Sequence, residues 1–328
     1  MVSSTRPEWL AAWAWLACSA CGSAPEPSRS GAPLPTASAA PEPRLAEARP
    51  PGAPARAVVP DPAETVPAYD VDADLSRRLA AAKEDLGEHA AAVRVTRPFV
   101  LAGPGASALR GAEPFIESVL GAYRNGRFGR SPERAISIYV FPAAAAYHAY
   151  CRRVYGGQEC VSRFGFYQPD ERRIVMQGGA GGTLSHELAH PFFEADFPTG
   201  PIWLNEGIAS VFEQPILHPE GEIHGGKNWR LPRLLQALGS PSERDVARIE
   251  ALFGMTDDTF RGARESLHYA IARYTCQWLD ERGFLWPFYQ AYRDGIASDP
   301  TGEAAFRQVV GMTPAEATRP WHRWLRAL

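Results

Sequence analysis

The chain has 328 residues, enough for one or two domains, and its hydrophobic content of 45% suffices for a buried core. The formal net charge is −3 and no block of Lys and Arg stands out, which argues against nucleic acid as a partner, since neutralising phosphates takes clustered positive charge. No apolar run reaches the length that a membrane-spanning helix needs.

Residues 1–21 are typical of a secretory signal. Arg6 precedes an apolar run that is too short to span a bilayer and is followed by small residues and cysteines. The segment "CSAC" resembles the cleavage box of bacterial lipoproteins, in which Cys21 would carry the lipid. Such a box usually has Leu where this chain has Cys18, so Cys18 is a second candidate. A plain cleaved signal and a misplaced start codon are the alternatives.

Residues 22–68 are rich in Pro, Ala, Ser and Arg and cannot bury a core. We expect a disordered tether that holds the rest of the chain off a bacterial membrane. The expected location is therefore extracytoplasmic, either as a cell-envelope lipoprotein of the periplasm or outer membrane or as a secreted protein. In such an oxidising compartment Cys151 and Cys160 can close a short disulfide loop, and two free buried thiols are the alternative. Cys276 is left over and is expected in a buried helix.

Residues 69–328 are expected to form the folded domain, and its first part mixes helices with strands. Apolar positions at helical spacing predict helices, and alternating ones predict strands. The expected helices are 73–90, 112–124 and 143–154, and the expected strands are 93–103, 135–141 and two around the Pro-Asp turn of 163–177. The second strand of that turn, 172–177, is a candidate edge strand on which an extended substrate can pair, and a plain core strand is the alternative.

After residue 198 the strand signals stop and only helices are expected. They comprise "WLNEGIASVFEQ", "WRLPRLLQAL", "SERDVARIEALF", "HYAIARYTCQWLDERG", "FLWPFYQAYRDG", residues 302–310 and a tail with a capping box at Thr313, Pro314 and Glu316. A mixed lobe, 69–197, followed by a helical lobe, 198–328, predicts an α+β fold with a cleft at the junction.

The stretch "SHELAH" at this junction carries the candidate chemistry. His186 and His190 lie four residues apart, so on a helix they share one face and can aim two imidazoles at one point. Zinc favours nitrogen ligands in a tetrahedral shell with one position left for water. Glu187 follows the first histidine, where it can reach that water as a general base but not the metal. This is the H-E-x-x-H arrangement of metallohydrolases.

A second motif, "WLNEGIASVFE", carries Glu206, which a second helix packed on the first could present as a third ligand. "HELAH" followed by "WLNEGIAS" resembles the paired motifs of the gluzincins, which are zinc metallopeptidases of the thermolysin type and, more closely, the aminopeptidase N type. The resemblance implies a zincin-like metallopeptidase fold with Zn²⁺ as the cofactor. It also implies His186, His190 and Glu206 as ligands and Glu187 as the general base.

Two further residues enter through this resemblance. Glu213 matches a glutamate often found in the second motif, where it could orient a ligand histidine, and an exposed helix glutamate is the alternative. The resembling families supply a Tyr or His after the third ligand to stabilise the oxyanion. "SLHYAIARY" offers His268, Tyr269 and Tyr274, of which we select Tyr269, and a core tyrosine with a satisfied hydroxyl is the alternative.

The chain departs from the aminopeptidase pattern before the histidine helix. Those enzymes carry a G-x-M-E-N stretch whose glutamate holds the free amine of the substrate, and the nearest stretch here, "IVMQGGAGG", has no acidic residue. An endopeptidase or another amide hydrolase therefore fits as well. Asp196 is a rival third ligand of the metzincin type, but those proteins need a glycine where this chain has Phe193.

Pro191 directly follows the second histidine. Proline lacks an amide hydrogen and clashes with the carbonyl four residues back, so we expect the helix to end or kink just past His190. That exit keeps both imidazoles on one face and shortens the path to Glu206. The alternative is that Pro191 turns His190 away from His186 and spoils the site.

Together these features predict zinc-dependent hydrolysis of peptide bonds in extracytoplasmic proteins or peptides, with Glu187 activating the water. The expected partner is a peptide or protein substrate. One alternative is a catalytically inactive, zincin-like binding protein tethered to the surface. Another is a structural envelope protein in which the "HELAH" sequence is accidental.

Overall fold

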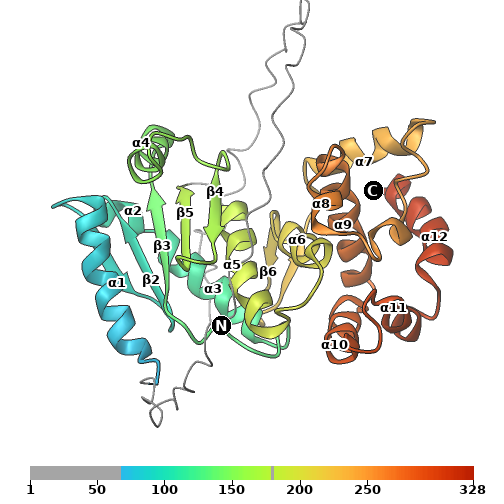
Figure 1. Ribbon diagram of the computed structural model, residues 1–328, viewed down its shortest axis with the longest axis horizontal. Coiled ribbons are helices and arrows are strands. Elements are labelled where there is room, and N and C mark those ends of the chain that lie inside the picture. The colour runs from blue at the N-terminus through green and yellow to red at the C-terminus, as the bar shows by residue number, and fades with distance from the viewer. Residues whose placement is uncertain (1–67, 179–180) are drawn as a thin grey trace, which may run out of the picture. The chain divides into compact units, whose positions relative to one another are not determined.

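The computed structural model of the protein describes residues 68–178 and 181–328 (Figure 1). The predicted signal, Cys18, Cys21 and all but the last residue of the predicted tether lie outside the described residues. No helix in the described ranges is long and apolar enough to cross a membrane.

A five-stranded mixed sheet forms the first half of the described chain (Figure 1). Its strands, in spatial order, are β1 (Ala91–Arg94), β2 (Phe99–Gly103), β3 (Ile136–Phe141), β5 (Arg173–Gln177) and β4 (Gly165–Gln168). The pairs β2–β3 and β3–β5 are parallel, whereas β1–β2 and β4–β5 are antiparallel. The single strand predicted over 93–103 is wrong, because a turn around Pro98, which has no backbone N–H to donate, divides it into β1 and β2.

The strand at 172–177 does not lie at the edge of the sheet. β5 pairs with β3 on one side and with β4 on the other, so β4 is the edge strand of this end. Ile174, Val175 and Met176 are buried one after another, as in a strand that is covered on both faces. The edge prediction failed because the alternation within one strand carries no information about its neighbours.

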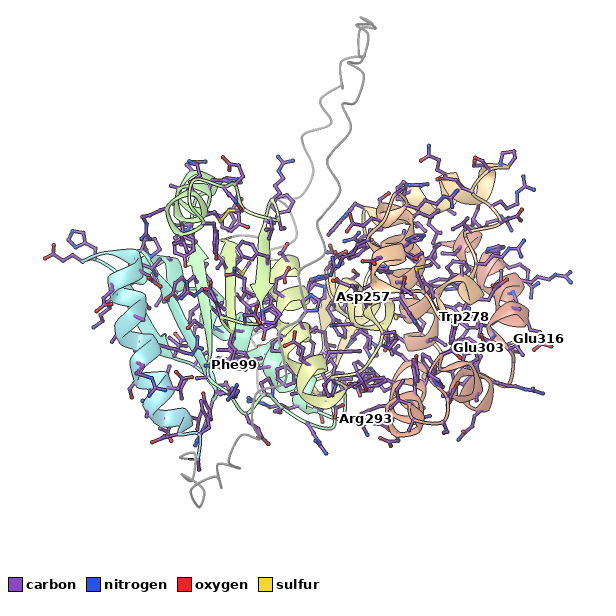
Figure 2. The ribbon with its side chains drawn as sticks, viewed as in Figure 1. Phe99, Asp257, Trp278, Arg293, Glu303 and Glu316 are labelled. Atoms are coloured by element: carbon purple, nitrogen blue, oxygen red, sulfur yellow. A yellow bond between two sulfur atoms is a disulfide. The ribbon has the colours of Figure 1, made fainter. Side chains whose placement is uncertain are left out.

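Helices cover both faces of the sheet. Tyr139 and Val175 point to the side of α1 (Val71–Leu86) and α4 (Ala144–Val154), where they share a core with Ala82 and Tyr150. The opposite face packs on α3 (Ala112–Arg124) and α5 (Gly181–Asp196), with α2 (Ala106–Leu109) in the connection before α3. Phe99, labelled in Figure 2, lies in this second core, where its ring stacks on Phe192 of α5. The predicted helices of this part are confirmed with small shifts of their ends.

The rest of the chain is mainly helical. It contains α6 (Ile202–Val211), α7 (Arg230–Gly239), α8 (Asp257–Phe260), α9 (Glu265–Asp280), α10 (Leu285–Gly295), α11 (Glu303–Val310) and α12 (Pro314–Ala327). The capping box at the start of α12 is confirmed. Two expectations are wrong: a small hairpin, β6 (Pro215–Leu217) with β7 (Ile223–Gly225), follows α6, and the expected helix at 242–253 is reduced to a 3-10 turn, η2 (Ile249–Leu252). The protein is therefore a mixed α/β molecule whose five-stranded sheet lies in the first half of the described chain, which is compatible with the expected α+β fold.

The cysteines of the described residues occupy two environments. Cys151, at the end of α4, forms a disulfide with Cys160 and closes a short surface loop. Cys276 is free and buried in α9, as expected. At Cys276 the helices α6 and α9 are in close contact, because a Cβ added to Gly207 of α6 would lie 2.8 Å from Cys276 Sγ. A glycine at this position lets α6 lie directly against α9.

Candidate metal centre

The histidine helix α5 continues through Pro191. It runs to Asp196, so of the two expected outcomes, an end or a kink just past His190, the end is wrong. Phe192 and Phe193 are buried after the proline, and their packing against the core holds the chain helical there. The alternative in which Pro191 turns His190 away is also wrong, because the rings of His186 and His190 lie edge to face with their centroids 4.9 Å apart.

The N-terminal turn of α5 packs tightly on the end of α6. A Cβ on Gly182 would lie 1.9 Å from the carbonyl oxygen of Glu213, so only glycine fits. One turn later, the hydroxyl of Ser185 donates to the carbonyl of Phe212 at 2.6 Å. These contacts fix the helix that carries the histidines relative to the helix that carries Glu206.

Glu206 brings a carboxylate to the point where the two imidazoles meet. Its Oε2 lies 3.5 Å from His186 Nε2 and 4.0 Å from His190 Nε2, and the three ligand atoms all lie within 4.8 Å of one another. Ligands about 2.0–2.1 Å from a tetrahedral metal ion lie about 3.3 Å from one another. The three side chains therefore need only small adjustments to coordinate one ion.

The two oxygens of Glu206 have different partners. Arg261 Nη2 donates to Oε1 at 2.8 Å, whereas Oε2 is buried and accepts no hydrogen bond from any residue in the described ranges. A buried acceptor without a partner is costly, and a metal ion at this point would satisfy it. Arg261 also leaves Glu206 one free oxygen, which favours coordination through a single atom.

The electrostatics of the cluster also favour a cation. Burial alone would lower the pKa of His186, but the carboxylates of Glu206, Glu187 and Glu213 outweigh it and raise the pKa to about 9. Burial would raise the pKa of Glu206, yet the two histidines and Arg261 hold it well below its usual range. The surrounding carboxylates therefore favour positive charge at this point, which a divalent ion would supply.

Among the described residues, the other ring nitrogen of His190 has a hydrogen-bond partner, whereas the Glu213 carboxylate lies beside His186 Nδ1 but beyond hydrogen-bond distance. Glu213 Oε1 lies 3.6 Å from His186 Nδ1, and the Glu213 carboxylate is itself held by Arg230 and by Asn228 Nδ2 at 2.7 Å. Asn205 Oδ1 lies 2.9 Å from His190 Nδ1. Glu213 is thus a buried residue beside a candidate ligand histidine, and the alternative of an exposed helix glutamate is wrong. Asn205 had no signal in the sequence beyond its place before Glu206.

Glu187 lies beside the ligand atoms without joining them. Its Oε2 is 3.8 Å from His190 Nε2, and its side chain is buried. Burial raises the pKa of Glu187, and the two neighbouring histidines only partly offset the effect. The edge strand β4 passes close by: Tyr167 lies with its ring parallel to that of His190, at 6.4 Å between centroids, and donates its hydroxyl to Glu194.

Tyr269 is the only one of the three candidate oxyanion donors that contacts a residue bound to the cluster. Arg261 Nη1 donates to the Tyr269 hydroxyl at 3.1 Å, and the same guanidinium holds Glu206. His268 instead faces the carbonyl of Phe260, and the hydroxyl of Tyr274 exchanges hydrogen bonds with the backbone of Asn228. Arg261 had no signal in the sequence, because it comes from a loop far along the chain from either motif.

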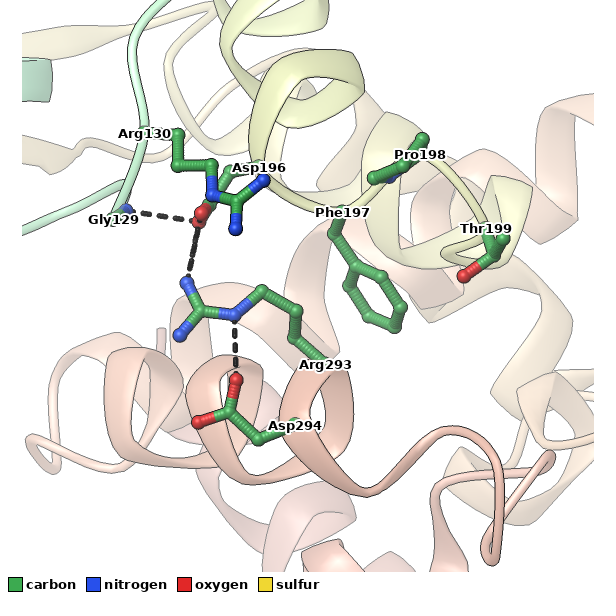
Figure 3. A pocket seen from close by; sticks show the side chains of 8 residues that line it. All are labelled: Gly129, Arg130, Asp196, Phe197, Pro198, Thr199, Arg293 and Asp294. Carbon is green, nitrogen blue, oxygen red and sulfur yellow. Dashed lines mark hydrogen bonds and ion pairs between the residues drawn. The ribbon is translucent and has the colours of Figure 1, made fainter.

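Asp196, the rival third ligand, lies away from the histidines. Figure 3 shows its carboxylate accepting from the backbone N–H of Gly129 at 2.9 Å and from Arg293 Nη1 at 2.8 Å, beside a hollow of about 340 Å³. α5 keeps its helical course past Phe193, so the sharp turn that would bring Asp196 back to the metal does not form. Its carboxylate instead joins α5 to α10 through Arg293.

The described residues therefore contain one buried cluster, His186, His190 and Glu206, that can hold a metal ion. No other group of three His, Cys, Asp or Glu side chains in 68–178 and 181–328 comes within the same reach. Compared with known proteins, the chain matches neither a family model nor a curated protein.

Proposed function

We propose that the protein is a zinc-dependent peptidase of the gluzincin type with a zincin-like fold. The observation that carries the proposal is the convergence of His186, His190 and Glu206 on one buried point, with Glu206 Oε2 lacking any other partner in the described chain. Two imidazoles and one carboxylate with an open fourth position form the ligand set of catalytic zinc sites. Bound zinc would polarise a water molecule and the substrate carbonyl.

The residues around this point have separate roles in the proposed reaction. Glu187 takes a proton from the attacking water, because its carboxylate is buried beside the ligand atoms and is not needed as a ligand. Arg261 and Tyr269 lie on the Glu206 side, where the Tyr269 hydroxyl can donate to the developing oxyanion. Glu213 and Asn205 hold the ligand imidazoles in the required orientation.

The edge strand β4 supplies a binding surface for an extended substrate. Its one ladder in the described sheet is with β5, so the other side of its backbone can accept a peptide strand. Tyr167 links this strand to the site, since its ring lies against His190. A substrate peptide paired with β4 would therefore pass beside the ligand histidines. The extracytoplasmic origin of the substrate and the lipid anchor of the protein at Cys21 remain predictions from the sequence.

The test uses Glu187→Gln in the full chain. The variant should retain zinc, measured by elemental analysis, and should lose cleavage of a mixed peptide library read by mass spectrometry. Glu117→Gln, at an exposed position of α3, is the matched control and should cleave like the wild type. Full cleavage by Glu187→Gln would contradict the mechanism. If the wild type contains zinc but cleaves nothing, the alternative of an inactive binding protein is supported. If it contains no zinc, the alternative in which the "HELAH" sequence is accidental is supported.

A further inference from the structure

A second feature of the molecule lies on the helical part, away from the metal centre. A groove of about 580 Å³ separates the segment 244–250 from α12, and none of its lining residues belongs to the candidate metal centre. Figure 2 labels Glu316, which lies in the first turn of this helix. The groove is lined by five arginines: Arg244, Arg248, Arg319, Arg323 and Arg326.

Helical geometry gathers three of these arginines. Arg319, Arg323 and Arg326 are spaced so that they share one face of α12, and all three are exposed. Trp321 and Leu325 are buried on the opposite side of the helix.

Two hydrogen bonds bring the preceding segment alongside. His322 Nε2 lies 2.7 Å from the carbonyl of Ala247, and Ile249 donates its backbone N–H to Thr318 Oγ1 at 3.0 Å. Arg244 and Arg248 thereby join a patch that no block of the sequence reveals.

The acidic residues of the groove do not neutralise this patch. Asp245 and Glu250 both pair with Arg248, at 2.7 Å and 3.6 Å, and Glu250 also accepts from Thr318. The other four arginines, which are Arg244, Arg319, Arg323 and Arg326, have no carboxylate within 4.0 Å among the residues that the structure describes. In a chain of net charge −3, this concentration does not follow from an excess of basic residues.

We propose that this groove binds an anion that carries more than one phosphoryl group. The planar guanidinium of arginine donates two parallel hydrogen bonds to phosphate oxygens, and several guanidiniums without carboxylate partners around one groove match an anion with several phosphoryl groups. The volume lies within the range of about 300–1,000 Å³ that is usual for small-molecule sites. The phosphoryl groups can come from a free bisphosphorylated metabolite or from the headgroups of a phospholipid surface.

The test compares two pairs of substitutions in the full, zinc-loaded chain. Binding of fructose 1,6-bisphosphate, which stands for free bisphosphates, is measured by calorimetry at low ionic strength, and binding to phosphatidylglycerol or phosphatidylcholine vesicles by co-sedimentation. The double variant Arg319→Gln with Arg323→Gln should weaken binding about tenfold or more. The double variant Arg110→Gln with Arg163→Gln removes the same charge from exposed positions elsewhere and should bind like the wild type.

The outcomes distinguish specific binding in the groove from non-specific electrostatic attraction. They also distinguish the two sources of phosphoryl groups. Replacing Arg319 and Arg323 by Lys keeps the charge but removes the paired donors, and this variant should also bind more weakly. Groove-dependent binding of the bisphosphate alone assigns a free ligand, and groove-dependent binding of phosphatidylglycerol vesicles alone assigns a lipid surface. Equal losses in both glutamine variants, or no binding of either probe by the wild type, would overturn the proposal. Groove-dependent binding of a single-stranded oligonucleotide without either phosphate probe would overturn it as well.

Discussion

Asn205 determines which nitrogen of His190 is available to a metal. Its side-chain oxygen lies 2.9 Å from His190 Nδ1, where it can accept from an Nδ1–H and so leave Nε2 with a lone pair for a metal. Nε2 is the atom that lies 4.0 Å from Glu206 Oε2. One amide thus fixes both the tautomer and the orientation of a ligand.

Replacing Asn205 by Leu should lower the affinity for zinc. The substitution keeps the approximate volume but removes the acceptor, so His190 loses its fixed tautomer, and the loss should be about tenfold to a hundredfold. Competition with a chromophoric chelator measures the affinity directly. Asn205→Asp restores an acceptor and should recover most of it. If Asn205→Leu binds zinc as tightly as the wild type, the orienting role assigned to Asn205 is wrong.

The four-residue spacing of His186 and His190 was enough to predict that they lie together, because the helix repeat places both on one face. The third candidate ligand, Glu206, depends on how the second helix packs on the first, and that packing depends on Gly182, whose role appears only in three dimensions. Arg261 could not be found at all, since a loop residue distant in sequence reaches Glu206 only through the fold. Local periodicity therefore predicts ligands on one helix, but not partners contributed by other elements.

At the scale of elements, Asp74 attaches α1 to the sheet. Its carboxylate accepts from the Tyr69 hydroxyl at 2.6 Å, from Arg172 Nη2 at 2.9 Å and from Arg78 Nε at 3.3 Å. Arg78 also donates to the carbonyls of Glu171 and Arg172, in the turn before β5. Burial alone would raise the pKa of Asp74, but the Tyr69 hydrogen bond and the two arginines outweigh it and lower the pKa.

Replacing Asp74 by Asn should destabilise the fold in a pH-dependent way. A carboxylate whose pKa is lowered by folding contributes stability above its unfolded pKa of about 3.9 and loses it as pH falls through the folded value. At pH 7 the variant should lose about 2 kcal/mol of unfolding free energy, because charged hydrogen bonds are broken. Urea unfolding should show this deficit shrinking below about pH 4.

Asp72 provides the control for this experiment. It lies in the same turn of α1, but its ion pairs with Arg94 and Arg97 are solvent-exposed. Asp72→Asn should therefore cost less than about 1 kcal/mol. Equal losses in the two variants would show that Asp74 does not act as a buried connection.

The elements themselves were predicted best where the apolar repeat is long. The helices 112–124 and 143–154 and the strand 135–141 appear nearly as expected, since each buries one regular stripe or run. Prediction failed where pairing or local turns decide the outcome. The strands β6 and β7 have 3 residues each, which is too short for an alternation of apolar and polar residues to be recognised in the sequence. Residues 242–253 have the composition of a helix, but only Ile249–Leu252 adopt a 3-10 turn.

At the scale of the whole molecule, the metal centre joins elements that are far apart in sequence. The candidate ligands come from α5 and α6. Arg261, which donates to Glu206, comes from the loop before α9, and Arg230, which holds Glu213, is the first residue of α7. Several ionisable side chains of the cluster are buried: His186, Glu187, His190, Glu206 and Glu213. A cation at their centre would therefore stabilise contacts between the sheet-bearing part and the helical part, and its effect should extend beyond the site.

If the cluster binds zinc as we propose, removing the ion should lower the thermal stability of the whole folded part that the structure describes. An ion that binds only the folded state stabilises it by about 2.7 kcal/mol when its free concentration is a hundred times its dissociation constant. A chelator should remove this contribution and lower the unfolding midpoint measured by calorimetry, whereas added zinc should restore it. His190→Ala removes a ligand, so its midpoint should respond little to either treatment. A wild-type midpoint unaffected by chelator in a protein shown to contain zinc would mean that the ion is bound elsewhere than between α5 and α6.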